Sequence, residues 1–197
     1  MAERIPHAVI DQLFLSARTQ NNWLPRDVPD SALREIIEIM KMGPTSANIQ
    51  PARFVFVKSK EAKEKLSPFL SEGNRAKTMA APVCAIIAHD LAFPDLIPRV
   101  FPHRPQMKDV YVGKPDLVAS TAFRNGTLQA AYFMLAARAI GLDVGGMSGF
   151  DNAGVDQAFF AGTQLKSNFL CNIGYGDPTG VMGRLPRLSY EEYAKIV

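Results

Sequence analysis

A polar loop at residues 43–51, Gly-Pro-Thr-Ser-Ala-Asn-Ile-Gln-Pro, carries the clearest chemical signal in this sequence. Pro44 and Pro51 fix the backbone angle φ and lack N–H groups. Between them, four side chains offer hydrogen-bond donors and acceptors: Thr45, Ser46, Asn48 and Gln50. Such a loop suits the polar edge of a flat ligand. The same residues also fit a helix that ends at Gly43 and an ordinary turn into a strand, so the loop alone does not separate the two interpretations.

Two shorter motifs carry polar groups near helix ends. Arg18, Thr19 and Asn21 lie at the end of a predicted helix, and an arginine with short polar side chains can bind a phosphate or a sugar chain. Asn74 and Lys77 are three residues apart, so both would lie on one side of a helix and could contact the edge of a flavin or nucleotide. Each motif is equally compatible with a solvated helix end.

Hydrophobic periodicity predicts the elements that position these groups. Apolar residues at helical spacing predict helices over about 7–17, from Asp30 through Met40, and over about 60–70, 117–140 and 190–196. Short β-branched and aromatic runs predict strands over 53–57, 82–88, 142–150 and 169–174. The 117–140 helix is apolar on most faces, so we expect it in the core or at a subunit interface. Glycines at 145, 146 and 149 weaken their strand, which indicates a close approach to the backbone there.

Residues 90–115 lack periodicity. Five prolines punctuate this stretch, at positions 94, 98, 102, 105 and 115. Long irregular insertions in compact domains are usually functional or mobile. We expect either a lid or an arm that wraps around a dimer partner, and the sequence favours neither.

Composition and charge exclude several classes of protein. The net charge of +3 is small and the basic residues are scattered, so no nucleic-acid partner is expected. No stretch approaches the ~20 apolar residues of a membrane span, and charges near the start argue against a signal peptide. Cys84 and Cys171 stand singly in apolar runs, as buried reduced thiols do, so we expect a cytoplasmic protein. The three histidines are far apart, so no metal site is expected. The length suits one domain over residues 1–197.

Together, the segments resemble the flavin-dependent nitroreductase family from about residue 10 to the C-terminus. The stretch Pro44-Thr-Ser-x-Asn-x-Gln-Pro-x-x-Phe54 is similar to the family signature Pro-Ser-Ser-x-Asn-x-Gln-Pro-x-x-Phe. Asn74-x-x-Lys77 resembles the motif that contacts the isoalloxazine ring in that family. Residues 17–21 and 145–149 occupy the places of its phosphate and ribityl motif and of its flavin-facing glycine-rich segment. Arg184 resembles the C-terminal basic residue that binds the flavin phosphate.

This resemblance implies an α+β fold with a central, mainly antiparallel sheet flanked by helices, in an intertwined homodimer. It implies tightly bound FMN between the subunits, with the loop 44–50 donated by the partner. The resemblance carries sixteen residues over as cofactor-binding: Arg18, Thr19, Asn21, Pro44, Thr45, Ser46, Asn48, Gln50, Asn74, Lys77, Gly146, Met147, Ser148, Gly149, Arg184 and Arg187. No catalytic base stands out, and solvent is expected to supply the second proton.

The implied activity is that of an FMN-dependent NAD(P)H oxidoreductase with ping-pong hydride transfer through flavin N5, using NADH or NADPH. The wording Ala17-Arg-Thr-x-Asn-x-Trp23 and Gly43-Pro-Thr-Ser-Ala-Asn-x-Gln-Pro-Ala-Arg-Phe54 resembles the malonic semialdehyde reductases, also called 3-hydroxypropanoate dehydrogenases. A small aldehyde is therefore the expected substrate. The alternatives are a broad nitroaromatic or quinone reductase and a non-catalytic flavin-binding dimer.

The sequence departs from the family pattern at three positions. Ala17 and Asn21 replace basic residues common in the family, and Ser148 stands where many members carry a glutamate. Fewer cations near the flavin stabilise its anionic reduced form less, so we expect a lower flavin potential than in typical nitroreductases.

Overall fold

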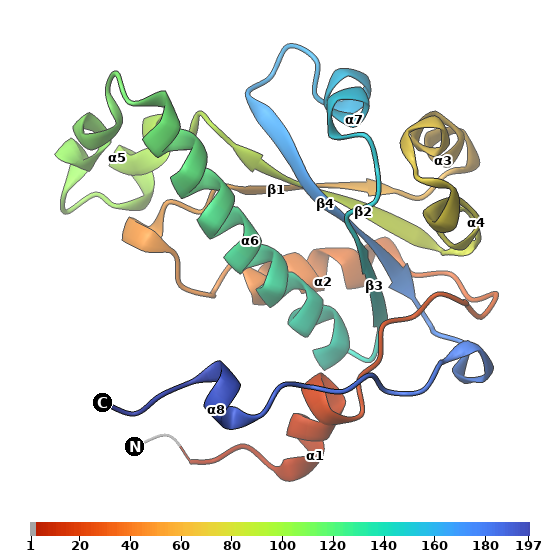
Figure 1. The fold of residues 1–197 in the computed structure, drawn as a ribbon. Helices are drawn as coiled ribbons and strands as arrows, with labels where there is room; N and C mark the ends of the chain where they lie inside the picture. The colour runs from red at the N-terminus through yellow and green to blue at the C-terminus, as the bar shows by residue number, and fades with distance from the viewer. Residues whose placement is uncertain (1–2) are drawn as a thin grey trace.

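A computed structural model describes residues 3–197, which are built around an antiparallel sheet. Among these residues the sheet has four strands in the order β1-β2-β4-β3 (Figure 1). The strands are β1 (Ala52–Val57), β2 (Val83–Asp90), β3 (Asp143–Met147) and β4 (Leu165–Gly174). Each neighbouring pair runs antiparallel, with Val55 of β1 opposite Ile86 of β2. The predicted antiparallel sheet flanked by helices is confirmed.

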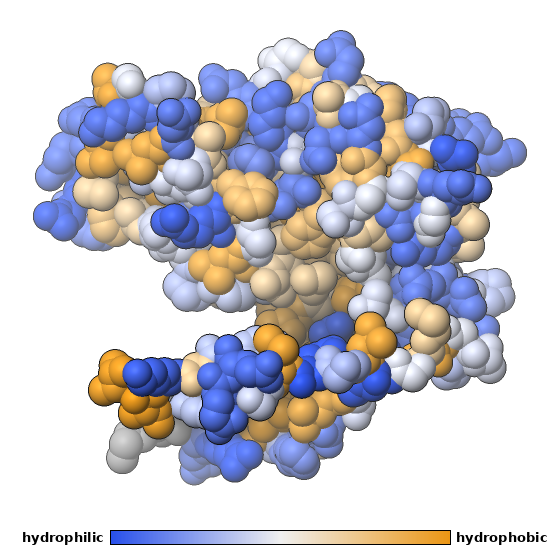
Figure 2. Space-filling model, in the orientation of Figure 1, coloured by the Kyte–Doolittle hydropathy of each residue, from blue (hydrophilic) through white to orange (hydrophobic). Residues whose placement is uncertain are grey.

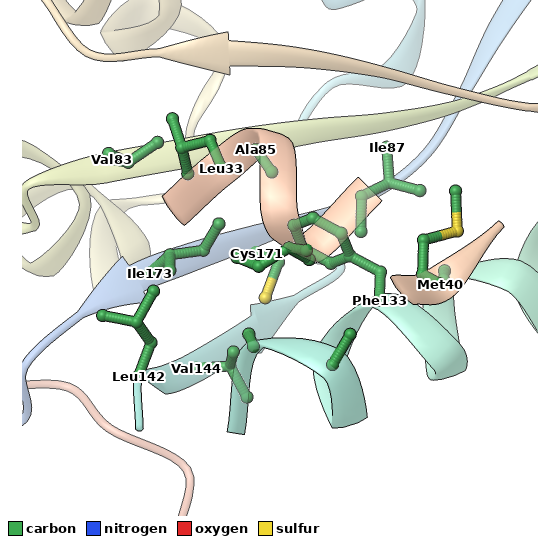
Figure 3. Close-up of a cluster of buried hydrophobic side chains, with 14 of the residues drawn as sticks. Leu33, Met40, Val83, Ala85, Ile87, Phe133, Leu142, Val144, Cys171 and Ile173 are labelled. Atoms are coloured by element: carbon green, nitrogen blue, oxygen red, sulfur yellow. The ribbon is translucent and has the colours of Figure 1, made fainter. Parts of the chain in front are cut away.

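Helices cover both faces of the sheet because its central strand is apolar on both. Val83, Ala85 and Ile87 of β2 point into one hydrophobic cluster, and the residues between them point into a second. The first cluster is covered by α2 (Asp30–Met40) and α6 (Pro115–Ala139), the second by α3 (Lys60–Leu66) and α7 (Asn152–Phe159). Figure 3 shows Phe133 of α6 packed among side chains of α2 and β2. The long apolar helix therefore lies in the core, as predicted.

The proline-rich region does not form the irregular insertion that the sequence predicts. It folds into short helical turns: Phe93–Leu96, α5 (Ile97–Val100) and Pro105–Tyr111. Proline is tolerated in the first turn of a helix, so the prolines begin these turns. Phe93 and Ile97 are fully buried in a third cluster with Ile49 and Ala122. This region is therefore packed against the loop 44–50 and against α6.

The two chain ends run side by side away from the sheet. α1 (His7–Ile10) continues as a π-helix to Leu15, so the predicted α-helix over 7–17 is wrong in its second half. α8 (Tyr190–Tyr193) is shorter than predicted. In Figure 1, α1 and α8 lie together below the sheet, and Figure 2 shows the molecule deeply hollowed between the C-terminal arm (residues 181–197) and the body. This arm is largely exposed and carries several apolar side chains.

Local signals predicted some element ends and missed others. The Ser59 side chain caps α3, and Gly141 follows α6 with φ of 83°. The helix predicted over 60–70 ends as α-helix at Leu66 because Pro68 follows, and the chain continues as a 3-10 turn. α6 begins at Pro115, two residues before the predicted start. No helix within residues 3–197 is long and apolar enough to cross a membrane.

Candidate functional site

A pocket of about 980 Å³ lies beside the two chain ends. Segments far apart in the sequence line it: Phe14, Leu15, Ala17, Arg18, Thr19, Asn21, Arg138, Met182, Gly183, Arg184, Leu185 and Arg187. We call it the arginine pocket, since four lining residues are arginines and, in the part of the chain that the structure describes, none is acidic. Its surplus of positive charge favours an anionic ligand.

Arg18 and Arg184 connect the two chain ends across this pocket. The Arg18 Nη2 atom donates to the carbonyl oxygen of Met182 at 2.5 Å. The Arg184 Nη2 atom donates to the carbonyl oxygens of Leu15 and of Ala17, the second at 3.4 Å. A guanidinium carries five N–H donors, so each arginine keeps donors available for a phosphate.

Arg138, in the last turn of α6, is a member of the pocket that sequence reasoning missed. Its Nη1 atom donates to the carbonyl oxygen of Leu13 at 2.9 Å. Partial burial lowers the pKa of Arg138, but a guanidinium stays protonated in proteins. The signal in the sequence was one cation in the last turn of the apolar run that follows Gln129.

Helix α4 (Glu72–Ala80) brings the two short polar motifs together. Lys77 Nζ donates to Asn21 Oδ1 at 3.2 Å, and Asn74 Nδ2 donates to the carbonyl oxygen of Gly149 at 2.8 Å. The stretch containing Asn74 and Lys77 is helical, as expected, so both side chains point toward the glycine-rich segment and the first motif. Because Asn21 also lines the arginine pocket, the pocket continues into this polar wall.

Gly145 of β3 and Gly149, just beyond the strand, are required by close contacts. A Cβ atom on Gly145 would lie 2.4 Å from the carbonyl oxygen of Gln20, whose N–H donates to Val144 at 3.1 Å. A Cβ atom on Gly149 would lie 2.7 Å from Asn74 Nδ2. These approaches explain why the strand carries glycine where the sequence predicted a close neighbour.

The other predicted residues of this segment and of the arm differ in how they can act. Gly146, Ser148 and Gly149 are exposed, whereas Met147 is 6% exposed and its sulfur accepts from the Thr78 hydroxyl at 3.4 Å. Only the backbone of Met147 can therefore face a ligand. Arg187 is exposed, and its Nη1 atom donates to the carbonyl oxygen of Leu185 at 2.9 Å.

Comparison with known proteins gives the family. The model of the nitroreductase family matches residues 15–175, which is most of the chain. The chain belongs to the nitroreductase family.

This nitroreductase-family chain is 58% identical over 196 residues to a protein of Stenotrophomonas maltophilia strain K279a, and the match covers 100% of both chains. The inferred name of that protein is NADH dehydrogenase/NAD(P)H nitroreductase. A protein of Burkholderia lata with the same inferred name is 57% identical over 189 residues, 96% of each chain. A nitroreductase structure from Exiguobacterium sibiricum, described as a complex with FMN, aligns with a TM-score of 0.85 at 18% identity and covers 100% of this chain and 99% of that one. At that identity the structural match supports the fold alone.

The loop 44–50 lies apart from the arginine pocket in this family member. The loop contacts α6 at Asn125, whose Oδ1 accepts from the Ser46 N–H at 2.9 Å, and at Tyr132, whose hydroxyl donates to the carbonyl oxygen of Pro44 at 3.1 Å. Asn125 lies 13 residues before Arg138 of the pocket, which is roughly 20 Å at about 1.5 Å per helical residue, and Tyr132 lies between them. None of residues 44–50 lines the arginine pocket. Within one chain, the structure therefore does not bring Pro44, Thr45, Ser46, Asn48 and Gln50 to the other predicted residues.

The loop backbone is strained, which the sequence did not indicate. Ala47, Asn48 and Gln50 have φ values of 47°, 53° and 43°, in the left-handed region that favours glycine. Each such non-glycine residue costs about 1–2 kcal/mol. Strain of this kind persists where surrounding contacts fix the backbone, and it clusters at functional sites.

Two buried polar residues of α6 help to hold the loop and its exit into β1. Asn125 and Gln129 are 3% and 2% exposed, and Gln129 Oε1 accepts from the Ala52 N–H at 2.9 Å. Sequence reasoning missed both. Their spacing of four residues on a predicted apolar helix, which places them on one face, was the signal. Within residues 3–197, no group of three or more His, Cys, Asp or Glu residues is placed to bind a metal.

Proposed function

We propose that this chain is an FMN-dependent NAD(P)H oxidoreductase that works as a homodimer. The observation that carries the proposal is that Asn21 both lines the arginine pocket and accepts a hydrogen bond from Lys77. The site therefore offers cations for a phosphate at one end and paired amide and ammonium groups for a polar ring edge at the other.

The residues present fit FMN. In this proposal Arg18 and Arg184 bind the phosphate, because both lie in a pocket whose described lining residues include no carboxylate. Thr19 and Asn21 bind the ribityl chain or the ring edge. Gly146 of β3 is exposed and has no Cβ atom, so a flat ring can approach the backbone closely there.

The chemistry divides between cofactor and protein. When bound, FMN would supply hydride transfer from NADH or NADPH to the substrate. Lys77 would hold a positive charge near the ring edge where negative charge develops, and Asn74 would hydrogen-bond to the pyrimidine edge. No side chain of the described residues is assigned as a catalytic base, so the second proton is assigned to solvent.

The dimer follows from the separation of the two halves of the site. No residue of the loop 44–50 lines the arginine pocket, and Asn125, which holds Ser46, lies roughly 20 Å along α6 from Arg138, so in this proposal one flavin takes its loop contacts from a second chain. Exposed apolar side chains beside the pocket support the same conclusion: Phe14 (55%), Leu15 (53%), Met182 (77%), Leu185 (75%) and Leu188 (57%). A partner chain that covers them also encloses the ligand.

The finer proposal is that the substrate is a small acidic aldehyde such as malonic semialdehyde. It is supported by the similarity of the two motifs around Arg18 and Asn48 to those of malonic semialdehyde reductases. The arginine pocket adds two cations, Arg138 and Arg187, that the phosphate does not require. The competing proposal is a broad nitroaromatic or quinone reductase, which the names of the relatives at 57–58% identity favour.

Purification and a visible spectrum test the cofactor and the dimer. The protein should be yellow, should release FMN on denaturation and should run as a dimer. Under anaerobic conditions NADH or NADPH should bleach it, whereas a protein that only stores flavin would keep its colour. Steady-state rates on malonic semialdehyde and on a nitroaromatic then separate the two substrate proposals. A colourless monomer that takes up no flavin would refute the proposed function.

A further inference from the structure

The strained loop needs an external support that the flavin-binding proposal does not provide. Three of the four residues 47–50 hold left-handed backbone angles, and the loop's internal bonds do not explain this. Two backbone bonds close the turn, from Asn48 N–H to the Thr45 carbonyl and from Ile49 N–H to the Ser46 carbonyl, each at 3.1 Å. The others use side chains that the loop must present to a ligand: Gln50 N–H donates to Thr45 Oγ1 at 3.3 Å, and Gln50 Nε2 donates to Asn48 Oδ1 at 3.0 Å and to the Asn48 carbonyl oxygen at 3.3 Å.

Arg53, the second residue of β1, supplies that support. One nitrogen, Nη1, donates to the carbonyl oxygens of Gln50 at 2.9 Å and of Ala52 at 2.8 Å. The other, Nη2, forms an ion pair with Asp90 Oδ2 at 2.8 Å. The planar Arg53 guanidinium therefore binds the carbonyl oxygen of Gln50, a residue with left-handed backbone angles, and the Asp90 carboxylate fixes the position of the guanidinium.

Asp90 is itself fixed on both sides. Its N–H donates to the carbonyl oxygen of Pro51 at 2.9 Å, and its Oδ1 atom accepts from the Ala92 N–H at 2.8 Å. The Asp90 side chain is 14% exposed. Asp90, at the end of β2, thus joins the loop exit at Pro51 through its N–H, and joins Arg53 to the start of the proline-rich region through its carboxylate.

The proline-rich region completes the support. Asn48 Nδ2 donates to the carbonyl oxygen of Val100 at 2.7 Å, and Ile49 is fully buried against Phe93 and Ile97. These contacts come from the region 90–115, which the sequence predicted to be either a lid or an arm around a dimer partner. The region underlies the loop in this structure.

We propose that Arg53, held by Asp90, is a positioning residue that fixes the strained loop in its ligand-presenting geometry. The proline-rich turns form the platform on which it does so. The inference rests on the proposed function, because the loop is taken to contact FMN bound by the partner chain. Among residues 3–197, the hydrogen-bond partners of the Arg53 side chain are two backbone carbonyls and the Asp90 carboxylate, so in this proposal it acts on the flavin through the loop.

Arg53→Gln tests the contact between the guanidinium and the loop carbonyl, and Lys58→Gln is its matched control. Lys58 lies just beyond the far end of β1, where it forms ion pairs with Asp27 at 3.3 Å and Asp30 at 3.0 Å but does not touch the loop. Both changes remove one cation and its ion pairs. Ala47→Gly is the second variant, because it loosens the loop without removing any ion pair, and glycine tolerates the left-handed angle.

Three readouts separate positioning from stability. FMN dissociation is measured by recovery of flavin fluorescence, the environment of the bound flavin by visible circular dichroism, and folding by thermal melting of the dimer without FMN. We expect Arg53→Gln to weaken FMN binding about 5- to 30-fold, because Arg53 acts through the loop and the effect should be smaller than loss of a direct charged hydrogen bond to the ligand. The dichroism of the bound flavin should change, and Arg53→Lys should restore part of the affinity. Ala47→Gly should melt at or near the wild-type temperature yet bind FMN more weakly.

The outcomes are distinguishable. If Arg53→Gln and Ala47→Gly both bind FMN as tightly as the wild type with unchanged dichroism, the positioning role is refuted while the proposed function stands. If Lys58→Gln weakens FMN binding as much as Arg53→Gln, loss of charge and not the grip on the loop is responsible, and the role is again refuted. If the wild type takes up no FMN, the proposed function fails and this inference fails with it.

Discussion

Arg18 and Arg184 each bind backbone carbonyls in the segment that carries the other: Arg18 donates to the carbonyl oxygen of Met182, and Arg184 donates to the carbonyl oxygens of Leu15 and Ala17. Each arginine therefore organises the segment that carries the other. A phosphate bound between them would replace contacts to neutral carbonyls with contacts to a dianion, which are stronger.

Arg184→Ala should weaken FMN binding about 10- to 100-fold, because a hydrogen bond to a charged group contributes roughly 1.5–3 kcal/mol and 1.4 kcal/mol is tenfold in affinity. Riboflavin lacks the phosphate, so its affinity should change little. Fluorescence titration with both flavins measures the difference. Arg34→Ala, on α2 and away from the arginine pocket, should affect neither. Equal loss of affinity for FMN and riboflavin would place Arg184 at the ring and not at the phosphate.

Lys77→Met should lower the midpoint potential of the bound flavin by roughly 30–60 mV. Removing a nearby cation destabilises the anionic reduced ring, and 30 mV corresponds to about 1.4 kcal/mol for a two-electron couple. FMN retention should also decrease, because Lys77 anchors Asn21 at 3.2 Å. Lys77→Arg keeps the charge and should restore most of the potential. A redox titration against a reference dye measures both, and an unchanged potential in Lys77→Met would remove the ring-edge role.

The sequence predicted the arrangement around Lys77 well because the evidence was local. Spacing of three residues in a helix places Asn74 and Lys77 on one side, and the helix formed. The same reasoning found the strands, since apolar β-branched runs need burial on both faces. The resemblance to the family depended on the order in which several motifs occur, which no single motif provides.

The sequence could not predict what depends on contacts between distant segments. Nothing around Arg53 indicates that its guanidinium grips the Gln50 carbonyl, because that contact needs Asp90, 37 residues later. The left-handed angles of Ala47, Asn48 and Gln50 were equally hidden, since no glycine marks them. In the proline-rich region, the absence of periodicity suggested irregular chain, whereas short 3-10 turns around Phe93 are too brief to show a period.

Gly145→Ala and Gly146→Ala should separate folding from binding. A Cβ atom at position 145 would meet the carbonyl oxygen of Gln20 at 2.4 Å, so we expect the free energy of unfolding to fall by about 1–3 kcal/mol. At position 146 the nearest atom, Met134 Sδ, is 3.7 Å away, an ordinary contact, and stability should change little. Gly146 is nevertheless exposed on the proposed flavin face, so its alanine variant should bind FMN more weakly. Urea unfolding without FMN, followed by flavin titration, measures the two effects. Equal stability of the two variants would contradict the contact at Gln20.

His89 should make the protein less stable in mildly acidic solution. The residue is 7% exposed, its Nδ1 atom has no hydrogen-bond partner among the described residues, and burial lowers its pKa from the ordinary value of 6.5. Asp156 opposes that shift and Lys166 adds to it, but burial is the largest cause.

Because the folded state holds the pKa of His89 below that of the unfolded chain, the unfolded chain binds the extra proton first as the pH falls. The contribution of His89 to the free energy of unfolding is therefore fully present above about pH 6.5 and is lost on acidification through the lowered pKa. His89→Gln should make stability less dependent on pH between 7.5 and 5.5, as measured by urea unfolding at each pH. His103→Gln, at an exposed position, should keep the wild-type dependence. A wild-type protein as stable at pH 5.5 as at pH 7.5 would show that His89 accepts its proton in the folded state without cost.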